Sequence, residues 1–199
     1  MKSAAHLVCL ALLTTLGACA SAPPTRYVTL ADDRAPQAGT ATTPAIAVVR
    51  ANVPELIDRP QLVLRQDPNH VVLSDQYRWA EPLRQAIPRL IAQDLGQILN
   101  SRRVAAVLPD DAGFPLDYKL TLEVQQLDAL VGQGVDVDVL WRLEAPNGKS
   151  LTGRSTFRQP LAGTPEDPLT LVAAQRQALR RVAGEIGKAV RGRGSAEGR

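Results

Sequence analysis

The chain has 199 residues, of which 45% are hydrophobic and 4% aromatic, so it can form one ordinary domain with a mainly aliphatic core. Its 23 basic and 20 acidic residues leave a net charge of +3, which is too small an excess to indicate a nucleic-acid-binding protein. With 2 histidines and 2 cysteines, the composition provides no set of ligands for a metal site, and no cofactor is expected.

Residues 1–18 have the features of a signal peptide. Lys2 precedes an apolar run at 7–17, which is shorter than the roughly 20 apolar residues that a membrane-spanning helix needs. The run ends in LGAC, which resembles a bacterial lipobox, where cleavage leaves the cysteine acylated as the first residue. We therefore expect Cys19 to anchor the protein in a membrane; an ordinary signal peptide with an incidental cysteine is the alternative. Because Ala20 rather than Asp follows, the periplasmic face of the outer membrane is the expected location.

Short strands are expected in the first half of the mature chain. Residues 19–44 are interpreted as the lipidated N-terminus and a spacer, which can include a short strand at 27–30. β-branched residues then predict strands at 46–53, 61–66 and 70–75, the last two separated by a turn signal.

A helix is predicted from Glu81 to Asn100, where apolar side chains recur every three or four residues. Pro82 suits the first turn of a helix, because the backbone N–H that proline lacks would have no partner there in any case. Pro88 would remove an interior hydrogen bond, so we expect a kink at this residue or a helix whose regular part starts late.

The clearest pattern is an alternation of apolar and polar residues at 118–125 and 135–144, and at 151–158 Leu151 and Phe157 lie in phase opposite polar residues. Such alternation is typical of strands that have one face on a core and the other face in water. Asn147-Gly148, a strong hairpin signal, joins the last two stretches, so the three together predict an antiparallel meander.

A second long helix is expected next, with Thr164 as its N-cap and Pro165 at its first position. Residues 192–199 contain too few apolar side chains to dock on a core and are interpreted as a disordered tail. The expected fold at 45–191 is a single α+β domain, in which a mostly antiparallel sheet packs against two long amphipathic helices.

Several short motifs suggest chemistry but have simpler explanations. Gly148-Lys149-Ser150 lacks the earlier glycine of a phosphate-binding loop and fits a hairpin turn. Asp136 and Asp138 share a strand face and could form a carboxylate pair, although a solvated sheet face is the favoured interpretation. The last helix carries basic residues that are interpreted as an exposed face, or else as a contact with anionic lipid or an acidic partner: Arg176, Arg180, Arg181, Lys188, Arg191 and Arg193.

The segment just before the first predicted helix contains Tyr77, Arg78, Trp79 and Glu81. Trp79 can pack on the start of the helix as a hydrophobic staple, which is a structural role. Tyr, Trp and Arg are also enriched at interface hot spots, so these four residues are candidate partner-binding residues. The two roles are compatible with each other.

Two stretches of the sequence carry a family resemblance, LIDRPQLV at 56–63 and WAEPL at 79–83. Together with the lipobox and the expected strand at 27–30, which begins with tyrosine, they resemble the ABC-type transport auxiliary lipoproteins, the PqiC-like family. The resemblance is specific in the first half of the chain and compatible in the second half.

This resemblance implies a non-catalytic envelope component rather than an enzyme. The implied partner is an MCE-domain periplasmic protein of an ABC-type system that moves lipids between membranes. The lipoprotein would then be the outer-membrane docking partner, as a homo-oligomer. Two alternatives stay open: an accessory lipoprotein of another outer-membrane assembly machine, and a periplasmic hydrolase that uses His70.

Overall fold

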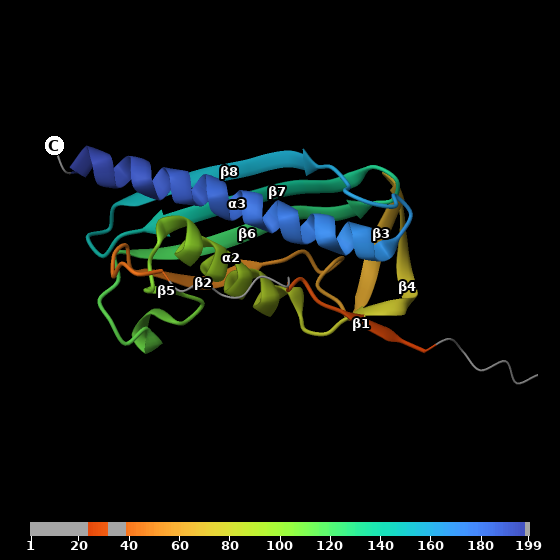
Figure 1. The fold of residues 1–199 in the computed structure, drawn as a ribbon, viewed down its shortest axis with the longest axis horizontal. Helices are drawn as coiled ribbons and strands as arrows, with labels where there is room; N and C mark the ends of the chain where they lie inside the picture. Colours follow the sequence, from red (N-terminus) through yellow and green to blue (C-terminus); the bar gives the residue numbers. More distant parts are fainter. Residues whose placement is uncertain (1–23, 32–38, 198–199) are drawn as a thin grey trace, which may run out of the picture.

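The computed structural model describes residues 24–31 and 39–197, so the expected signal peptide and Cys19 lie outside the described residues. Within them, eight strands form one mixed sheet, and two long helices pack on it and on each other (Figure 1). The elements in chain order are β1 (Arg26–Val28), β2 (Ile46–Asn52), β3 (Gln61–Asp67), β4 (His70–Trp79), α2 (Leu83–Leu99), β5 (Val104–Ala105), the short 3-10 helix η1 (Pro109–Asp111), β6 (Tyr118–Leu130), β7 (Gly134–Glu144), β8 (Ser150–Gln159) and α3 (Pro168–Glu197).

The predicted antiparallel meander is confirmed. β6, β7 and β8 pair in that order, and the register of β7 with β8 runs without a shift from Val135 opposite Gln159 to Glu144 opposite Ser150. In the turn between them, Gly148 has a φ of 81°, a conformation that glycine adopts without steric cost. The hairpin signal and the alternation of side chains therefore determined this half of the sheet.

The prediction of a mostly antiparallel sheet is wrong. Of the seven strand pairings in the described part of the chain, four are parallel: β1 with β4, β2 with β5, β2 with β6 and β3 with β6. The edge of β6 that faces away from β7 is occupied by β2 along its first half and by β3 at its end. The chain reaches β6 from β2 by a long connection that includes α2, as parallel pairing requires. The single α+β domain is as predicted.

The first predicted helix is present as α2 and begins at Leu83, directly after Pro82 in the N-cap position. Pro88 lies inside this helix and is buried. Pro88 cannot make one backbone hydrogen bond of the helix. Burial of the apolar stripe, which includes Ile87 and Leu90, compensates for the stability that is lost there.

The second helix, α3, begins three residues later than Thr164 and Pro165 suggested. Its first residue is Pro168, and the carboxylate of Asp167 accepts a hydrogen bond of 3.1 Å from the backbone N–H of Leu169. Asp167 and Pro168 thus perform the capping and first-turn roles that the sequence assigned to the earlier pair.

The far end of α3 extends to Glu197, so residues 192–197, which were expected in a disordered tail, are helical. At Arg191, the guanidinium Nη2 donates a hydrogen bond to the backbone carbonyl of Ile98 near the end of α2. This contact ties the C-terminal turns of the two helices together.

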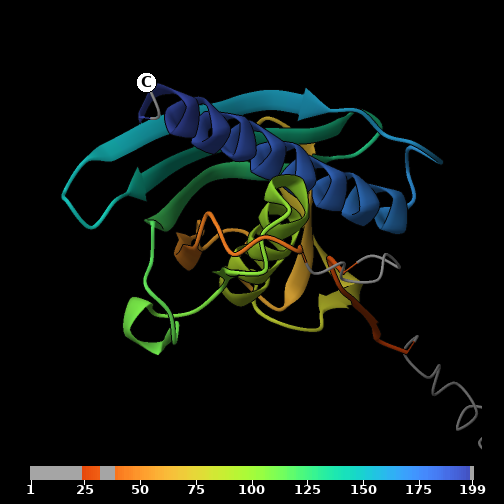
Figure 2. The same ribbon diagram turned by 60° about the vertical axis from the view of Figure 1, so that its left-hand side comes forward.

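The two helices and the sheet form two layers around an aliphatic core (Figure 2). α3 packs across β6, β7 and β8, whereas α2 packs on β2 and β5. Between the helices, both guanidinium ends of Arg176 bind the carboxylate of Asp94 at 2.6 and 2.7 Å. The side chain of Arg176 is 5% exposed and that of Asp94 is 2% exposed. The prediction that Arg176 belongs to an exposed basic face is therefore wrong. The two short contacts offset the cost of removing both charges from water.

Candidate functional site

The two stretches that carry the family resemblance meet where α2 begins. The backbone N–H of Trp79 donates to the carbonyl of Pro60 at 2.7 Å, and that of Ala80 donates to the carbonyl of Val28 at 2.9 Å. The start of β3 and the ends of β4 and β1 are thereby joined beside the first turn of α2. We call the residues that line a hollow of about 220 Å³ at this junction the motif cluster: Asp58, Arg59, Pro60, Trp79, Ala80, Glu81, Pro82 and Arg84.

Asp58 has a structural role in this cluster. Its carboxylate accepts a hydrogen bond from the backbone N–H of Arg84 at 3.3 Å and another from the Arg84 guanidinium at 2.8 Å. Pro82, in the N-cap position, makes no side-chain cap bond of its own. Asp58 therefore caps α2 from a distant part of the chain, where a negative charge also suits the helix dipole.

The four candidate partner-binding residues lie together but differ in accessibility. Trp79 is 7% exposed and belongs to the same core cluster as Leu83, in agreement with the hydrophobic staple. Tyr77 and Arg78 are half-buried, as is Glu81, whose carboxylate pairs with Arg89. Their function as partner contacts stays a prediction.

The neighbouring strand β1 adds an aromatic and a basic side chain to this end of the sheet. Tyr27 is 70% exposed, and the guanidinium of Arg26 lies 6.0 Å from the centre of the Tyr77 ring. The sequence motifs did not identify Asp58, Arg84 or Tyr27 as candidate site residues. A helix start at Pro82 with no local cap residue was the sequence signal that a distant cap existed.

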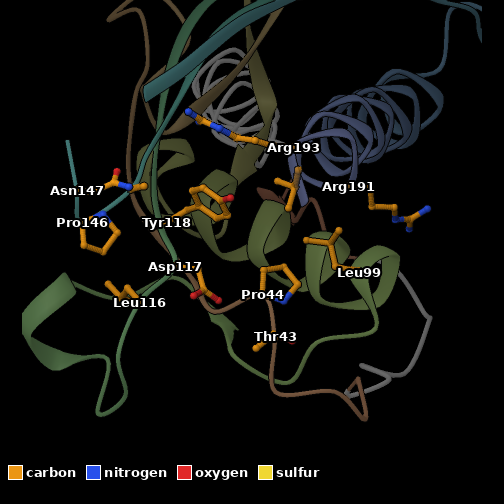
Figure 3. A pocket seen from close by; sticks show the side chains of 12 residues that line it. Thr43, Pro44, Leu99, Leu116, Asp117, Tyr118, Pro146, Asn147, Arg191 and Arg193 are labelled. Carbon is orange, nitrogen blue, oxygen red and sulfur yellow. The ribbon is translucent and has the colours of Figure 1, made fainter. Parts of the chain in front are cut away.

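A second hollow lies at the opposite end of the molecule, where the last turns of α2 and α3 approach the β7–β8 turn (Figure 3). We call it the distal cavity. It has a volume of about 530 Å³ and its lining is mainly apolar: Thr43, Pro44, Leu99, Leu116, Asp117, Tyr118, Ala145, Pro146, Asn147, Val190, Arg191 and Arg193.

The charged groups of the distal cavity differ in their pairing. The carboxylate of Asp117 accepts a hydrogen bond of 2.7 Å from the backbone N–H of Ala45, and Arg191 donates to the Ile98 carbonyl. By contrast, Nη1 of Arg193 is buried and has no hydrogen-bond partner among the described residues. In Figure 3, Arg193 and Asp117 lie on opposite sides of the cavity.

The open face of the sheet carries the two aspartates that were considered as a carboxylate pair. Asp138 is bound by both ends of the Arg154 guanidinium at 2.7 and 2.5 Å, and Asp136 is bound by Arg158 at 2.6 and 2.9 Å. The hydrogen bonds from Arg154 lower the pKa of Asp138 below its ordinary value. Each carboxylate therefore has its own cation, an arrangement that supports an ionised sheet surface rather than an acid–base pair.

Other site types gain no support from the residues that the structure describes. Across 24–31 and 39–197, no group of three or more His, Cys, Asp or Glu side chains could hold a metal ion. No described helix combines the length and apolar character needed to cross a bilayer. His70, on which a hydrolase would depend, is an exposed residue 3.8 Å from the carboxylate of Asp67.

Comparison with known proteins gives both the fold and the family. A solved structure described as an uncharacterized protein has a TM-score of 0.65 and 17% identity, covering 84% of this chain and 99% of that chain. Protein XCC0632 from Xanthomonas campestris has a TM-score of 0.56 and 20% identity, covering 88% of this chain and 97% of that chain. No curated protein matches the sequence. The model of the ABC-type transport auxiliary lipoprotein component matches residues 29–187, so the chain belongs to that family.

Proposed function

We propose that this protein is a non-catalytic docking subunit of an MCE-type intermembrane lipid transport system, anchored by Cys19 at the periplasmic face of the outer membrane. The observation that carries the proposal is membership of the auxiliary lipoprotein family over residues 29–187. The MCE-domain partner, the outer-membrane location and a homo-oligomeric state are parts of the proposal.

The anchor would orient the domain. β1 begins at Arg26, seven positions after Cys19. Seven extended residues span at most about 25 Å, so a lipidated Cys19 would keep β1 and the motif cluster close to the bilayer. β6, with 13 residues, is about 44 Å long, and Figure 1 shows β1 at one end of the molecule and the C-terminus of α3 at the other. The distal cavity would then face the periplasm.

The motif cluster supplies the proposed docking surface. Trp79, which is buried, and Asp58, whose side chain is 8% exposed, would position β4 and α2 rather than contact the partner. The accessible side chains around them would touch the partner. These are in particular Tyr27, which is 70% exposed, and Arg84, whose side chain is 61% exposed. Tyrosine and arginine are residue types that dominate interface hot spots. The accessible parts of Tyr77, Arg78 and Glu81 complete this surface.

A crosslinking pull-down of the full-length lipoprotein from solubilised envelopes tests the proposal, with partners identified by mass spectrometry. We expect recovery of an MCE-domain protein, and weaker recovery with Tyr27→Ser and with Cys19→Ala. Leu140→Ser is the matched control, because Leu140 is a half-exposed apolar residue on the open face of the sheet. Recovery of a β-barrel assembly machine instead, or of no partner, would overturn the proposal.

A further inference from the structure

The distal cavity has the composition of a small-molecule site. Its volume of about 530 Å³ falls within the range of roughly 300–1,000 Å³ that is usual for ligand pockets. Two prolines, two leucines, an alanine, a valine and the Tyr118 ring supply an apolar wall. Such a wall takes up hydrocarbon because burial removes apolar surface of the ligand from water.

Five of the residues that line the cavity have no free backbone N–H with which to bind a peptide. The N–H groups of Asp117 and Tyr118 both donate to the carbonyl of Ala45, and that of Ala145 donates to the carbonyl of Lys149. Pro44 and Pro146 have no N–H. Recognition of an extended peptide depends on free main-chain donors and acceptors, so these lining residues offer no donor for it.

Arg193 gives the cavity a preference for an anion. A charged donor that is buried without a partner is costly, and a carboxylate or phosphate oxygen would satisfy Nη1 with a strong charge-assisted hydrogen bond. The other charged groups compete little with this role, since Arg191 is bound to the Ile98 carbonyl and Asp117 to the Ala45 N–H.

We propose that the distal cavity binds an acyl-chain amphiphile with an anionic head, either a fatty acid or a phospholipid. The chain lies against Pro44, Leu116 and Pro146, and the carboxylate or phosphate binds Arg193. This inference rests on the cavity alone and adds direct lipid binding to the proposed docking role, at the end of the molecule away from the motif cluster.

Photocrosslinking in cells that produce the full-length lipoprotein tests this site. A photoreactive benzoylphenylalanine replaces Leu116 in the cavity or, as the matched control, Leu140 on the open face. Cells are labelled with radioactive phosphate or radioactive acetate before irradiation. We expect a labelled adduct from position 116 and none from position 140. Because the acyl groups expected on Cys19 would also carry the acetate label, the adduct is read on the proteolytic peptide that contains the crosslinking position, separated from the N-terminal peptide. Both labels on that peptide identify a phospholipid, whereas the acetate label alone identifies a fatty acid.

Substitution of Arg193 tests the head-group contact. Arg193→Glu should reduce the labelled adduct by about tenfold, because a hydrogen bond to a charged group is lost and a repulsive charge is added. Lys188→Glu, an equal charge change at an exposed position of the same helix, should leave the adduct unchanged. If Arg193→Glu fails to fold, Arg193→Gln replaces it in the test. This variant should also reduce the amount of labelled adduct.

Three outcomes would overturn the inference: no lipid adduct from position 116, an adduct with a protein there, or equal lipid labelling from positions 116 and 140. Loss of the lipid adduct leaves partner recovery in the pull-down unaffected. Failure of lipid binding is therefore distinguishable from failure of the docking proposal.

Discussion

Two aspartate–arginine pairs with the same two-pronged geometry lie on opposite sides of the sheet. Asp94 and Arg176, the covered pair, are buried between α2 and α3 with side chains 2% and 5% exposed. Asp138 and Arg154, the open-face pair, have side chains 11% and 59% exposed. The contacts are almost equally short, at 2.5 to 2.7 Å in both pairs. The two pairs therefore differ in their access to solvent and not in their geometry.

The difference shows where this fold concentrates its stability. Removing one member of the covered pair leaves the other charge buried without its main partner, whereas the open-face guanidinium returns to solvent. The motif cluster resembles the covered pair, because Trp79 and Asp58 act inside the packed structure. The residues that reveal the family therefore build its frame, and surface side chains around them remain available for a partner.

Breaking the covered pair should have the largest effect. Asp94→Ala leaves Arg176 buried without its main partner and should lower the free energy of unfolding by about 3–5 kcal/mol, measured by urea titration. The double variant Asp94→Leu with Arg176→Met should recover most of this loss, since two apolar side chains need no pairing. A loss below about 1 kcal/mol for the single variant would contradict the distinction between the pairs.

A methyl group added under the indole of Trp141 tests the packing of the covered face. A Cβ at Gly153 would lie 2.0 Å from the Trp141 ring, so Gly153→Ala should destabilise the protein by about 1–3 kcal/mol. Thr152→Ala, at the exposed neighbouring position, measures the cost of a loss of strand propensity, which Gly153→Ala does not incur. A melting temperature of Gly153→Ala equal to that of the wild type would show that the ring moves aside freely.

Removing the distant cap should have a moderate effect. Asp58→Ala deletes the hydrogen bonds to Arg84 at the start of α2 and should lower the free energy of unfolding by about 1 kcal/mol. Glu81→Ala removes the partly exposed pair with Arg89 and provides the comparison, with a smaller expected loss of stability. A free energy of unfolding unchanged by Asp58→Ala would show that Asp58 does not act as the cap.

The open-face pair should show the smallest effect, and mainly as a pH dependence. Because Arg154 holds the pKa of folded Asp138 below its ordinary value of 3.8, the pair stabilises the fold above that pH. This contribution is lost as the pH falls through the lower, folded pKa. Melting temperatures of wild type and Asp138→Asn should therefore differ slightly at pH 7 and converge in strong acid. A difference in melting temperature that grows as the pH falls would show that the pair does not stabilise the fold through an ionised Asp138.

The meander and both helices could be predicted because their signals are local. Alternation and Asn147-Gly148 specify β7 and β8, and apolar stripes specify α2 and α3. The directions of the other strands could not be predicted, since β2 meets β6 only after a connection of more than sixty residues. No local pattern states which distant strand will occupy the second edge of β6.

The candidate site was predicted in part. The position of Trp79 before the helix predicted that its ring packs on the start of α2, whereas residue type did not reveal how accessible Tyr77, Arg78 and Glu81 are. Asp94 and Arg176 could not be paired in advance, because each occupies a polar position beside an apolar stripe on a separate helix. The distal cavity gave no sequence signal, since its lining comes from loops and helix ends that are far apart in the chain.

The proposed docking role is tested most directly by photocrosslinking from position 27. Benzoylphenylalanine replaces Tyr27 in the full-length lipoprotein in its native envelope, with the same replacement of Leu140 as the control. We predict an adduct with an MCE-domain protein from position 27 and none from position 140. An adduct with a different envelope protein, or an MCE adduct from position 140 alone, would contradict docking through the surface that Tyr27 and the motif cluster form.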